Sequence, residues 1–148
     1  MKTVSEILRI KPEPHNVIEA DAKVIDALIL MNSVNLSYLV VMEKGNFKGI
    51  FSERDYTRNV ILKGRTSDTS TVQEVMTTNL PSVAPSDTVE TCMRLLDAHK
   101  TRYLPVLNGN KLEGVVTLND VLRQALWNKE DVFDELAHKL ADQGDKIF

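Results

Sequence analysis

Two stretches of the chain place apolar residues at spacings of three and four, which is the pattern of a helix with one buried face. The first stretch contains Val24, Ala27, Leu28, Met31 and Val34. The second contains Val89, Cys92, Met93, Leu96 and His99. A short apolar run, typical of a buried strand, follows each stretch at residues 38–42 and 103–107. The pattern therefore predicts two helix–strand units of the same design.

Turn residues after each of these strands indicate a hairpin. Gly45-Asn46 and Asn108-Gly109-Asn110 predict return strands at 47–51 and 111–116. Further helices are expected at 4–8, 53–62, 72–76 and 118–126, and extended segments at 16–20 and 81–84. We place the N-caps of the two central helices at Asp21 and Ser86. The order β-α-β-β-α in each copy predicts an α+β fold with a small mixed sheet.

The chain also repeats a short motif of the form Gly-apolar-apolar-Ser/Thr-x-x-Asp. It occurs at residues 49–55 and again, 65 residues later, at 114–120. We expect a first repeat at 1–65, a second repeat at 66–126 and a helix at 127–148, with a polar linker at 63–70 between the two copies. A repeat of about 60 residues buries too little apolar surface to be stable alone. The two copies should therefore pack sheet to sheet, with pseudo-twofold symmetry.

Two copies of this motif in register, each preceded by a matching helix and strand, resemble a tandem pair of CBS domains (named after cystathionine β-synthase), also called a Bateman module. The resemblance covers residues 1–126, and the form Ser52-Glu53-Arg54-Asp55-Tyr56 is similar to that of stand-alone bacterial CBS-pair proteins. It implies a regulatory module that binds AMP, ADP or ATP, or else S-adenosylmethionine or NAD, in clefts between the copies. It also implies a homodimer without catalytic activity.

Composition narrows the function further. The 148 residues include 18 Lys and Arg against 21 Asp and Glu, which gives a net charge of −3 and disfavours binding to a nucleic-acid backbone. The single cysteine, Cys92, excludes a cysteine-based zinc site, and His15, His99 and His138 have no metal-ligand spacing. No apolar run approaches the ~20 residues that span a membrane, and no signal peptide is expected, so we expect a cytoplasmic protein.

The motif supplies the candidate binding residues. Ser52 and Thr117 stand at the start of a helix, where a hydroxyl caps backbone N–H groups or binds a phosphate. Asp55 and Asp120 lie one turn later, where a carboxylate can accept two hydrogen bonds from a ribose diol. The alternative is structural: the hydroxyls are simple N-caps, and the carboxylates complement the helix dipole.

The resemblance places each motif aspartate beside the strand entry of the other copy, and the two sites then differ in charge. The Asp55 site collects Arg54 and Arg102, with Lys100, Arg58 and Lys63 as additions, and arginine holds phosphate well. The Asp120 site has Leu118 and Asn119 beside it, and Ser37 and Tyr38 at the strand entry. We therefore expect AMP or ADP at Asp55, and a site at Asp120 that is weak, empty or suited to a neutral ligand.

The remaining candidates are apolar or lie in the last helix. We expect adenine to lie against Ile18 or Val83, near Pro105 and Val40, while Tyr38 and Tyr103 pack at the rim or stack on the base. The helix at 127–148 is amphipathic, and it extends a dimer contact, docks an effector protein or folds back on its own module. The function rivals are a scaffold with non-binding clefts and, less favoured by the motifs, an enzyme.

Overall fold

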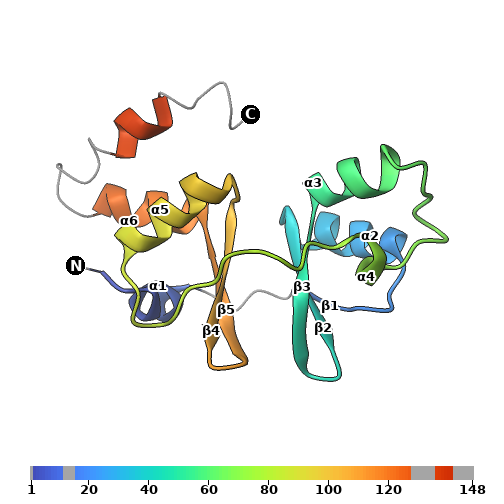
Figure 1. Cartoon of the computed structure of the whole chain (residues 1–148), viewed down its shortest axis with the longest axis horizontal. Coiled ribbons are helices and arrows are strands. Elements are labelled where there is room, and N and C mark those ends of the chain that lie inside the picture. Colours follow the sequence, from blue (N-terminus) through green and yellow to red (C-terminus); the bar gives the residue numbers. More distant parts are fainter. Residues whose placement is uncertain (1, 12–15, 128–135, 142–148) are drawn as a thin grey trace. The chain divides into compact units, whose positions relative to one another are not determined.

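The computed structural model describes residues 2–11, 16–127 and 136–141 (Figure 1). The chain forms two compact units, of which one is 13–80 and the other combines 1–12 with 81–148. Helices and strands occur in both, so the fold is α+β, as expected from the sequence.

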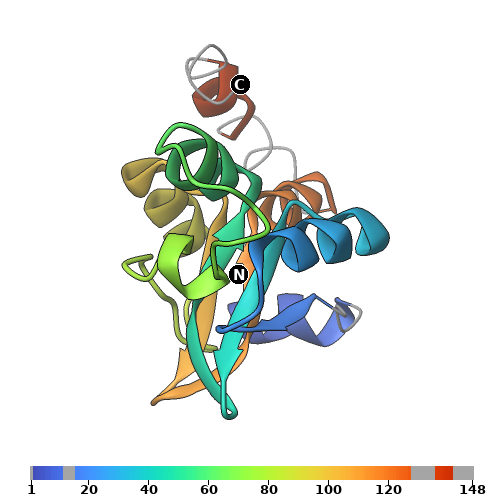
Figure 2. The same cartoon turned by 90° about the vertical axis from the view of Figure 1, so that its right-hand side faces the viewer.

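The unit of residues 13–80 has a three-stranded sheet with the order β1-β2-β3. Its strands are β1 (Val17–Glu19), β2 (Tyr38–Glu43) and β3 (Asn46–Ser52). Strand β1 is parallel to β2, and β2 is antiparallel to β3, so the expected mixed sheet is present. The helical segments are α2 (Val24–Val34), α3 (Glu53–Asp55), the π-helix η1 (Tyr56–Ile61) and α4 (Val72–Val75). Figure 2 looks onto this unit, with α2 and α4 in front of the sheet.

The other unit has a two-stranded antiparallel sheet of β4 (Tyr103–Asn108) and β5 (Lys111–Thr117). Its helices are α1 (Val4–Ile10), α5 (Val89–His99) and α6 (Leu118–Trp127). Residues 136–141 are also helical, with Leu136 buried, whereas the rest of the expected helix at 127–148 lies largely outside the described residues.

The strand expected at 81–84 is reduced to one parallel bridge, between Val83 and Val106. The Val83 N–H donates to the Pro105 carbonyl (3.0 Å), and the Val83 carbonyl accepts from Leu107 N–H (2.9 Å). Pro81 and Pro85 lie on either side of this segment. Proline has no N–H to donate to a sheet, so a longer strand is not possible here.

Each short leading helix packs against the core of the other repeat. From α1, Val4 and Ile7 are buried in the same core as Leu104. From α4, Val72 and Val75 are buried in the same core as Leu39. The boundaries of the compact units therefore differ from those of the sequence repeats. Helix α1 opens the first repeat but lies in the unit that holds most of the second, and α4 opens the second repeat but lies in the unit of residues 13–80.

Both expected N-caps are wrong, because α2 begins at a backbone contact outside the helix and α5 begins at a different side-chain cap. Helix α2 begins after Lys23, which makes no side-chain cap, and the Val24 N–H instead donates to the Ser70 carbonyl (2.9 Å) in the linker. Asp21 is exposed. Helix α5 begins after Thr88, whose hydroxyl accepts from Thr91 N–H, and Ser86 lies two residues too early.

His99 was expected on the buried face of α5, but it is exposed. The buried face of this helix consists of Val89, Cys92 and Leu96. The Cys92 thiol is free and fully buried, as expected from its place on this face. Burial raises its pKa to about 11, with a further contribution from the negative charge of Asp87. The Cys92 thiol is therefore unreactive at neutral pH.

The described residues contain no helix that is both long and apolar enough to cross a membrane. They also contain no cluster of three or more His, Cys, Asp or Glu side chains that could hold a metal ion.

Candidate functional site

The repeated motif forms the same turn in both units, where a strand passes directly into a helix. Strand β3 ends at Ser52. The Ser52 hydroxyl accepts a hydrogen bond from Asp55 N–H (3.3 Å), and Oδ2 of Asp55 accepts one from Ser52 N–H (2.9 Å). Thr117 and Asp120 exchange the same two bonds, at 3.2 and 2.8 Å. The capping role considered for these residues is therefore present in both copies.

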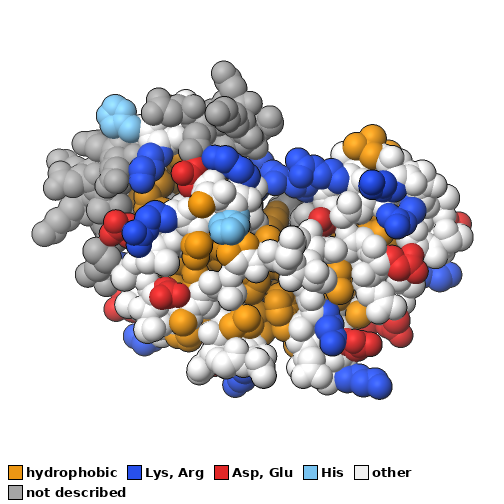
Figure 3. Space-filling model, in the orientation of Figure 1, with side chains coloured by type: hydrophobic (Ala, Val, Ile, Leu, Met, Phe, Trp, Pro, Cys, Tyr) orange, Lys and Arg blue, Asp and Glu red, His pale blue; other side chains and the backbone are white. Residues whose placement is uncertain are grey.

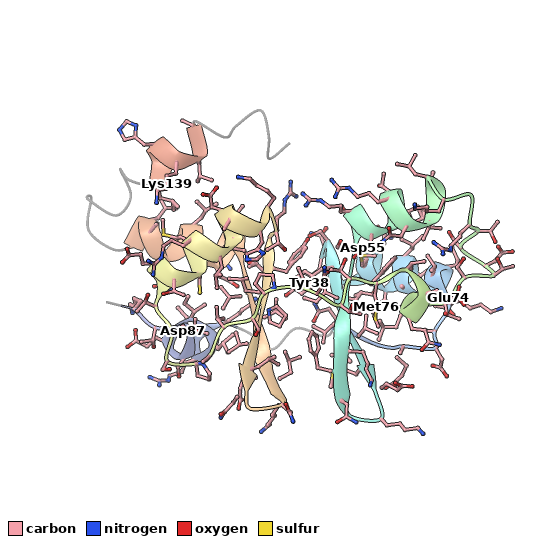
Figure 4. All side chains as sticks on the ribbon, viewed as in Figure 1. Tyr38, Asp55, Glu74, Met76, Asp87 and Lys139 are labelled. Carbon is pink, nitrogen blue, oxygen red and sulfur yellow. The ribbon has the colours of Figure 1, made fainter. Side chains whose placement is uncertain are left out.

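Both motif carboxylates are buried and hydrogen-bonded. In the first unit, Asp55 is 6% exposed and its Oδ2 also accepts from the Ser52 hydroxyl at 3.0 Å. Its other oxygen, Oδ1, accepts from the Thr77 hydroxyl at 2.6 Å. Thr77 reaches this position because the chain after α4 pairs with β3 at Ile50. Figure 4 labels Asp55, the last residue of α3, and Met76 at the end of α4, one residue before Thr77.

The partners of Asp120 are charged. Asp120 is 3% exposed, and its Oδ2 accepts from the Lys11 ammonium at 2.8 Å. Its Oδ1 accepts from the Arg123 guanidinium at 2.5 Å. Burial alone would raise the pKa of Asp120, but the hydrogen bonds from Lys11 and Thr117 and the positive charge of Lys11 outweigh it. The pKa of Asp120 therefore lies below its ordinary value.

Lys11 and Thr77 each bind a backbone carbonyl and the motif carboxylate of their unit, through Oδ2 of Asp120 and Oδ1 of Asp55 respectively. Thr77 donates its N–H to the Ile50 carbonyl (2.9 Å) and its hydroxyl to Asp55. The Lys11 ammonium donates to the Val115 carbonyl (2.8 Å) and to the motif carboxylate. Ile50 and Val115 occupy the same place in the motif. The Lys11 ammonium thus makes both kinds of contact that Thr77 makes with its backbone N–H and its hydroxyl.

The glycine of each motif leaves room for the neighbouring segment that packs on it. A Cβ on Gly49 would lie 2.5 Å from the Thr77 carbonyl oxygen. A Cβ on Gly114 would lie 2.9 Å from a methyl carbon of Leu8. The absence of a side chain at these two positions therefore lets α4 and α1 approach their sheets.

The basic candidates lie on the surface of their units, where Figure 3 shows Lys and Arg side chains in blue. The exposed candidates are Arg54, Arg58, Lys63, Lys100, Arg102 and Asn119. Arg54 and Arg58 belong to the α3–η1 segment that begins at the motif. Lys100 pairs with Asp97 at 3.2 Å. The grouping of Arg102 and Lys100 with Asp55 stays a prediction.

The apolar candidates lie close to the motif within each unit. Tyr38 is the strand partner of Ser52, and Tyr103 is the strand partner of Thr117. Tyr38 is 3% exposed, so it belongs mainly to the packed interior, whereas Tyr103 and Ile18 are half-buried. Val83 and Pro105 are buried and joined by the backbone hydrogen bond described above.

Sequence reasoning missed Lys11 and Thr77. Thr77 follows the expected helix at 72–76 directly, so its place beside a motif could have been suspected once α4 was known to pack on β3. Lys11 and Asp120 are 109 positions apart, and no local pattern relates them. Only the packing of α1 against β5 brings this lysine to the carboxylate.

The tandem repeat, with one Gly-apolar-apolar-Ser/Thr-x-x-Asp turn per unit, agrees with a comparison against protein families. A family model for the CBS domain matches the chain twice, at residues 4–61 and 72–126. The chain belongs to the CBS-domain family. The resemblance drawn from the two motifs is thereby confirmed, and the protein is a CBS pair.

Relatives of this CBS pair occur in bacteria and plants. It is 34% identical to the CBS domain-containing protein YhcV of Bacillus subtilis over 104 residues, which are 70% of this chain and 74% of YhcV. It is 32% identical to the mitochondrial CBS domain-containing protein CBSX3 of Arabidopsis thaliana over 121 residues. That match covers 78% of this chain and 59% of CBSX3, so this chain spans only part of that relative's length.

Solved structures have the same fold. A protein with CBS domains from Burkholderia ambifaria is 34% identical, with a TM-score of 0.80, over 87% of this chain and 97% of that one. CBSX2 is 29% identical, with a TM-score of 0.69, over 84% of this chain and 96% of its own, and was solved in complex with AMP. The solved structures that share the fold of this CBS pair thus include one that holds AMP.

Proposed function

We propose that this CBS pair is a non-catalytic regulatory module that binds an adenine nucleotide (AMP, ADP or ATP) between its two repeats. The observation that carries the proposal is the Asp55 carboxylate, which is buried at the start of a helix and accepts from two side-chain hydroxyls, Ser52 and Thr77. The AMP complex of CBSX2 supports the class of ligand.

The two hydroxyls make the Asp55 carboxylate adaptable. A hydroxyl can turn its hydrogen away from an acceptor without moving a heavy atom, because the O–H bond rotates. Rotation at Ser52 and Thr77 frees lone pairs on both oxygens of Asp55 for a ribose 2′,3′-diol. The same hydroxyl oxygens can then accept hydrogen bonds themselves. The site can thus exchange internal bonds for bonds to the sugar.

In this proposal, basic residues bind the phosphate. Arg54 and Arg58 are exposed on the helical segment that begins at the motif, and a helix start itself favours an anion. Arg102 and Lys100, from the strand entry of the second repeat, complete the proposed phosphate contacts. Arginine is suited to this role because its planar guanidinium binds two phosphate oxygens at once.

Regulation follows from a ligand that bridges the repeats. A nucleotide that binds one arrangement of the repeats more tightly than another shifts the population toward the first, by no more than its differential affinity. In this proposal the chain is a homodimer, and a separate effector protein binds one arrangement of the repeats in preference to the other. The alternative is a scaffold whose clefts bind nothing, or a module for S-adenosylmethionine or NAD.

The test is a ligand screen on the full chain by calorimetry and thermal unfolding, with AMP, ADP, ATP, S-adenosylmethionine and NAD. We expect an adenine nucleotide to raise the melting temperature, and Asp55→Asn to weaken its binding at least tenfold. Asp26→Asn, at an exposed position of α2, is the matched control and should leave binding unchanged. Absence of any shift with all five ligands would favour the scaffold, and turnover of a nucleotide would favour an enzyme.

A further inference from the structure

The carboxylate of Asp120 is held by two cations, whereas the distant side-chain donor to Asp55 is the uncharged Thr77 hydroxyl. Its Oδ2 is held by the Lys11 ammonium, and its Oδ1 by the Arg123 guanidinium. Neither cation can release the carboxylate by rotating a single O–H bond, as Thr77 can at Asp55. A ribose diol would have to displace at least one cation from this carboxylate.

Displacing Lys11 is unfavourable for two reasons. The side chain of Lys11 is 17% exposed and that of Asp120 is 3% exposed, so the pair is largely withdrawn from water. Separating such a pair leaves an uncompensated charge in a poorly solvated place. The same ammonium also satisfies the Val115 carbonyl, and Val115 is buried, so its departure would leave this backbone acceptor without a partner.

We infer that Lys11 is a specificity-determining residue which closes the Asp120 site to ribose, so that each chain binds one nucleotide, at Asp55. The inference rests on the proposed function. It assigns a role to a residue that lies outside both motifs and 109 positions from the carboxylate that it holds. Arg123 assists by holding Oδ1, but it is 53% exposed and more easily displaced.

The difference between the two sites is one of charge as well as access. The Ser52 and Thr77 hydroxyls that donate to Asp55 are neutral, so they place no positive charge beside its carboxylate. Asp120 is paired with two cations, which occupy both of its oxygens and offset its negative charge. A nucleotide therefore gains hydrogen bonds to a carboxylate at Asp55 that Asp120 does not offer.

The test is the stoichiometry of AMP binding to the full chain, by isothermal titration calorimetry at pH 7.5. We expect one AMP per chain, a dissociation constant changed less than twofold in Asp120→Asn, and at least tenfold weaker binding in Asp55→Asn. Two AMP per wild-type chain would overturn the inference. So would a single AMP that Asp120→Asn removes and Asp55→Asn does not.

A second set of variants tests whether removal of the two cations allows AMP to bind at Asp120. In the double variant Lys11→Met with Arg123→Gln we expect a second AMP per chain, whereas Lys111→Met, at an exposed position of β5, should retain one. A folded double variant that still binds one AMP would overturn the role of Lys11. If the double variant does not fold, the stoichiometry of the wild type and of Asp120→Asn still decides.

Failure of the wild type and the double variant alike to bind any nucleotide would overturn the proposed function itself. Binding by the double variant alone would support closure and refute the Asp55 site.

Discussion

The hydroxyl of Thr77 donates a hydrogen bond of 2.6 Å to Oδ1 of Asp55, although the two residues are 22 positions apart. The bond joins the end of a helix that opens the second sequence repeat to the motif that closes the first. It is supported by two backbone bonds between Thr77 and Ile50, at 2.9 and 3.0 Å. The start of α3 and the end of α4 are thus fixed to one another through a buried carboxylate.

Removing this hydroxyl should destabilise the unit of residues 13–80. We expect Thr77→Val to lower the free energy of unfolding by about 1–3 kcal/mol, because it leaves Oδ1 of a buried carboxylate without that partner. Thr77→Ser retains the hydroxyl and should lose less. Urea unfolding followed by circular dichroism measures the difference. Thr78→Val, at the exposed neighbouring position, is the control, and an equal loss in both valine variants would contradict the role of the bond.

The two motif glycines should differ in their tolerance of a methyl group. In Gly49→Ala the new Cβ meets the Thr77 carbonyl oxygen at 2.5 Å, a backbone atom that cannot move without breaking the Ile50–Thr77 bridge. We expect a loss of about 1–3 kcal/mol in the free energy of unfolding. In Gly114→Ala the Cβ meets the end of the flexible Leu8 side chain at 2.9 Å, and the loss should be smaller.

The same urea titrations, run on both alanine variants under identical conditions, test this order. Equal losses, or a larger loss in Gly114→Ala, would show that the Thr77 backbone yields as readily as the Leu8 side chain. That outcome would refute the close contact between α4 and β3 as the reason for Gly49.

Acid should weaken the unit that contains Asp120. The pKa of Asp120 is lowered in the folded chain, so its contribution to stability is complete above the unfolded-state pKa of about 3.9. It is lost as the pH falls through the lower folded-state pKa. We expect wild-type unfolding free energy, measured at pH 6, 4 and 3, to fall more steeply below pH 4 than that of Asp120→Asn.

Asp26→Asn is the control for this measurement, because Asp26 is exposed. Its acid dependence should follow the wild type. Lys11→Met should lower the stability at pH 6 and flatten the loss on acidification, since the ion pair that lowers the pKa of Asp120 is then absent. Identical slopes in the wild type and Asp120→Asn would refute the contribution of this carboxylate.

The local patterns of the sequence determined most of the secondary structure and the family. Apolar spacing placed α2 and α5, the turn residues placed both hairpins, and the two motifs placed Asp55 and Asp120 at the start of a helix. These features depend on contacts between residues close in sequence, so the sequence reports them directly. The N-cap expected for α2 failed because its partner is distant: α2 begins where the Ser70 carbonyl accepts from Val24 N–H. The N-cap expected for α5 failed by two positions, because the local cap is Thr88.

Tertiary structure alone decided how the two motifs differ. By sequence, Asp55 and Asp120 are equivalent positions of one repeat, and the difference expected between their sites rested on neighbouring arginines. In the folded chain, each leading helix packs on the other repeat, so Asp55 receives the neutral Thr77 and Asp120 the charged Lys11. A contact across 109 positions has no local signature, because it arises only when the helix and the sheet that hold its two ends are packed together.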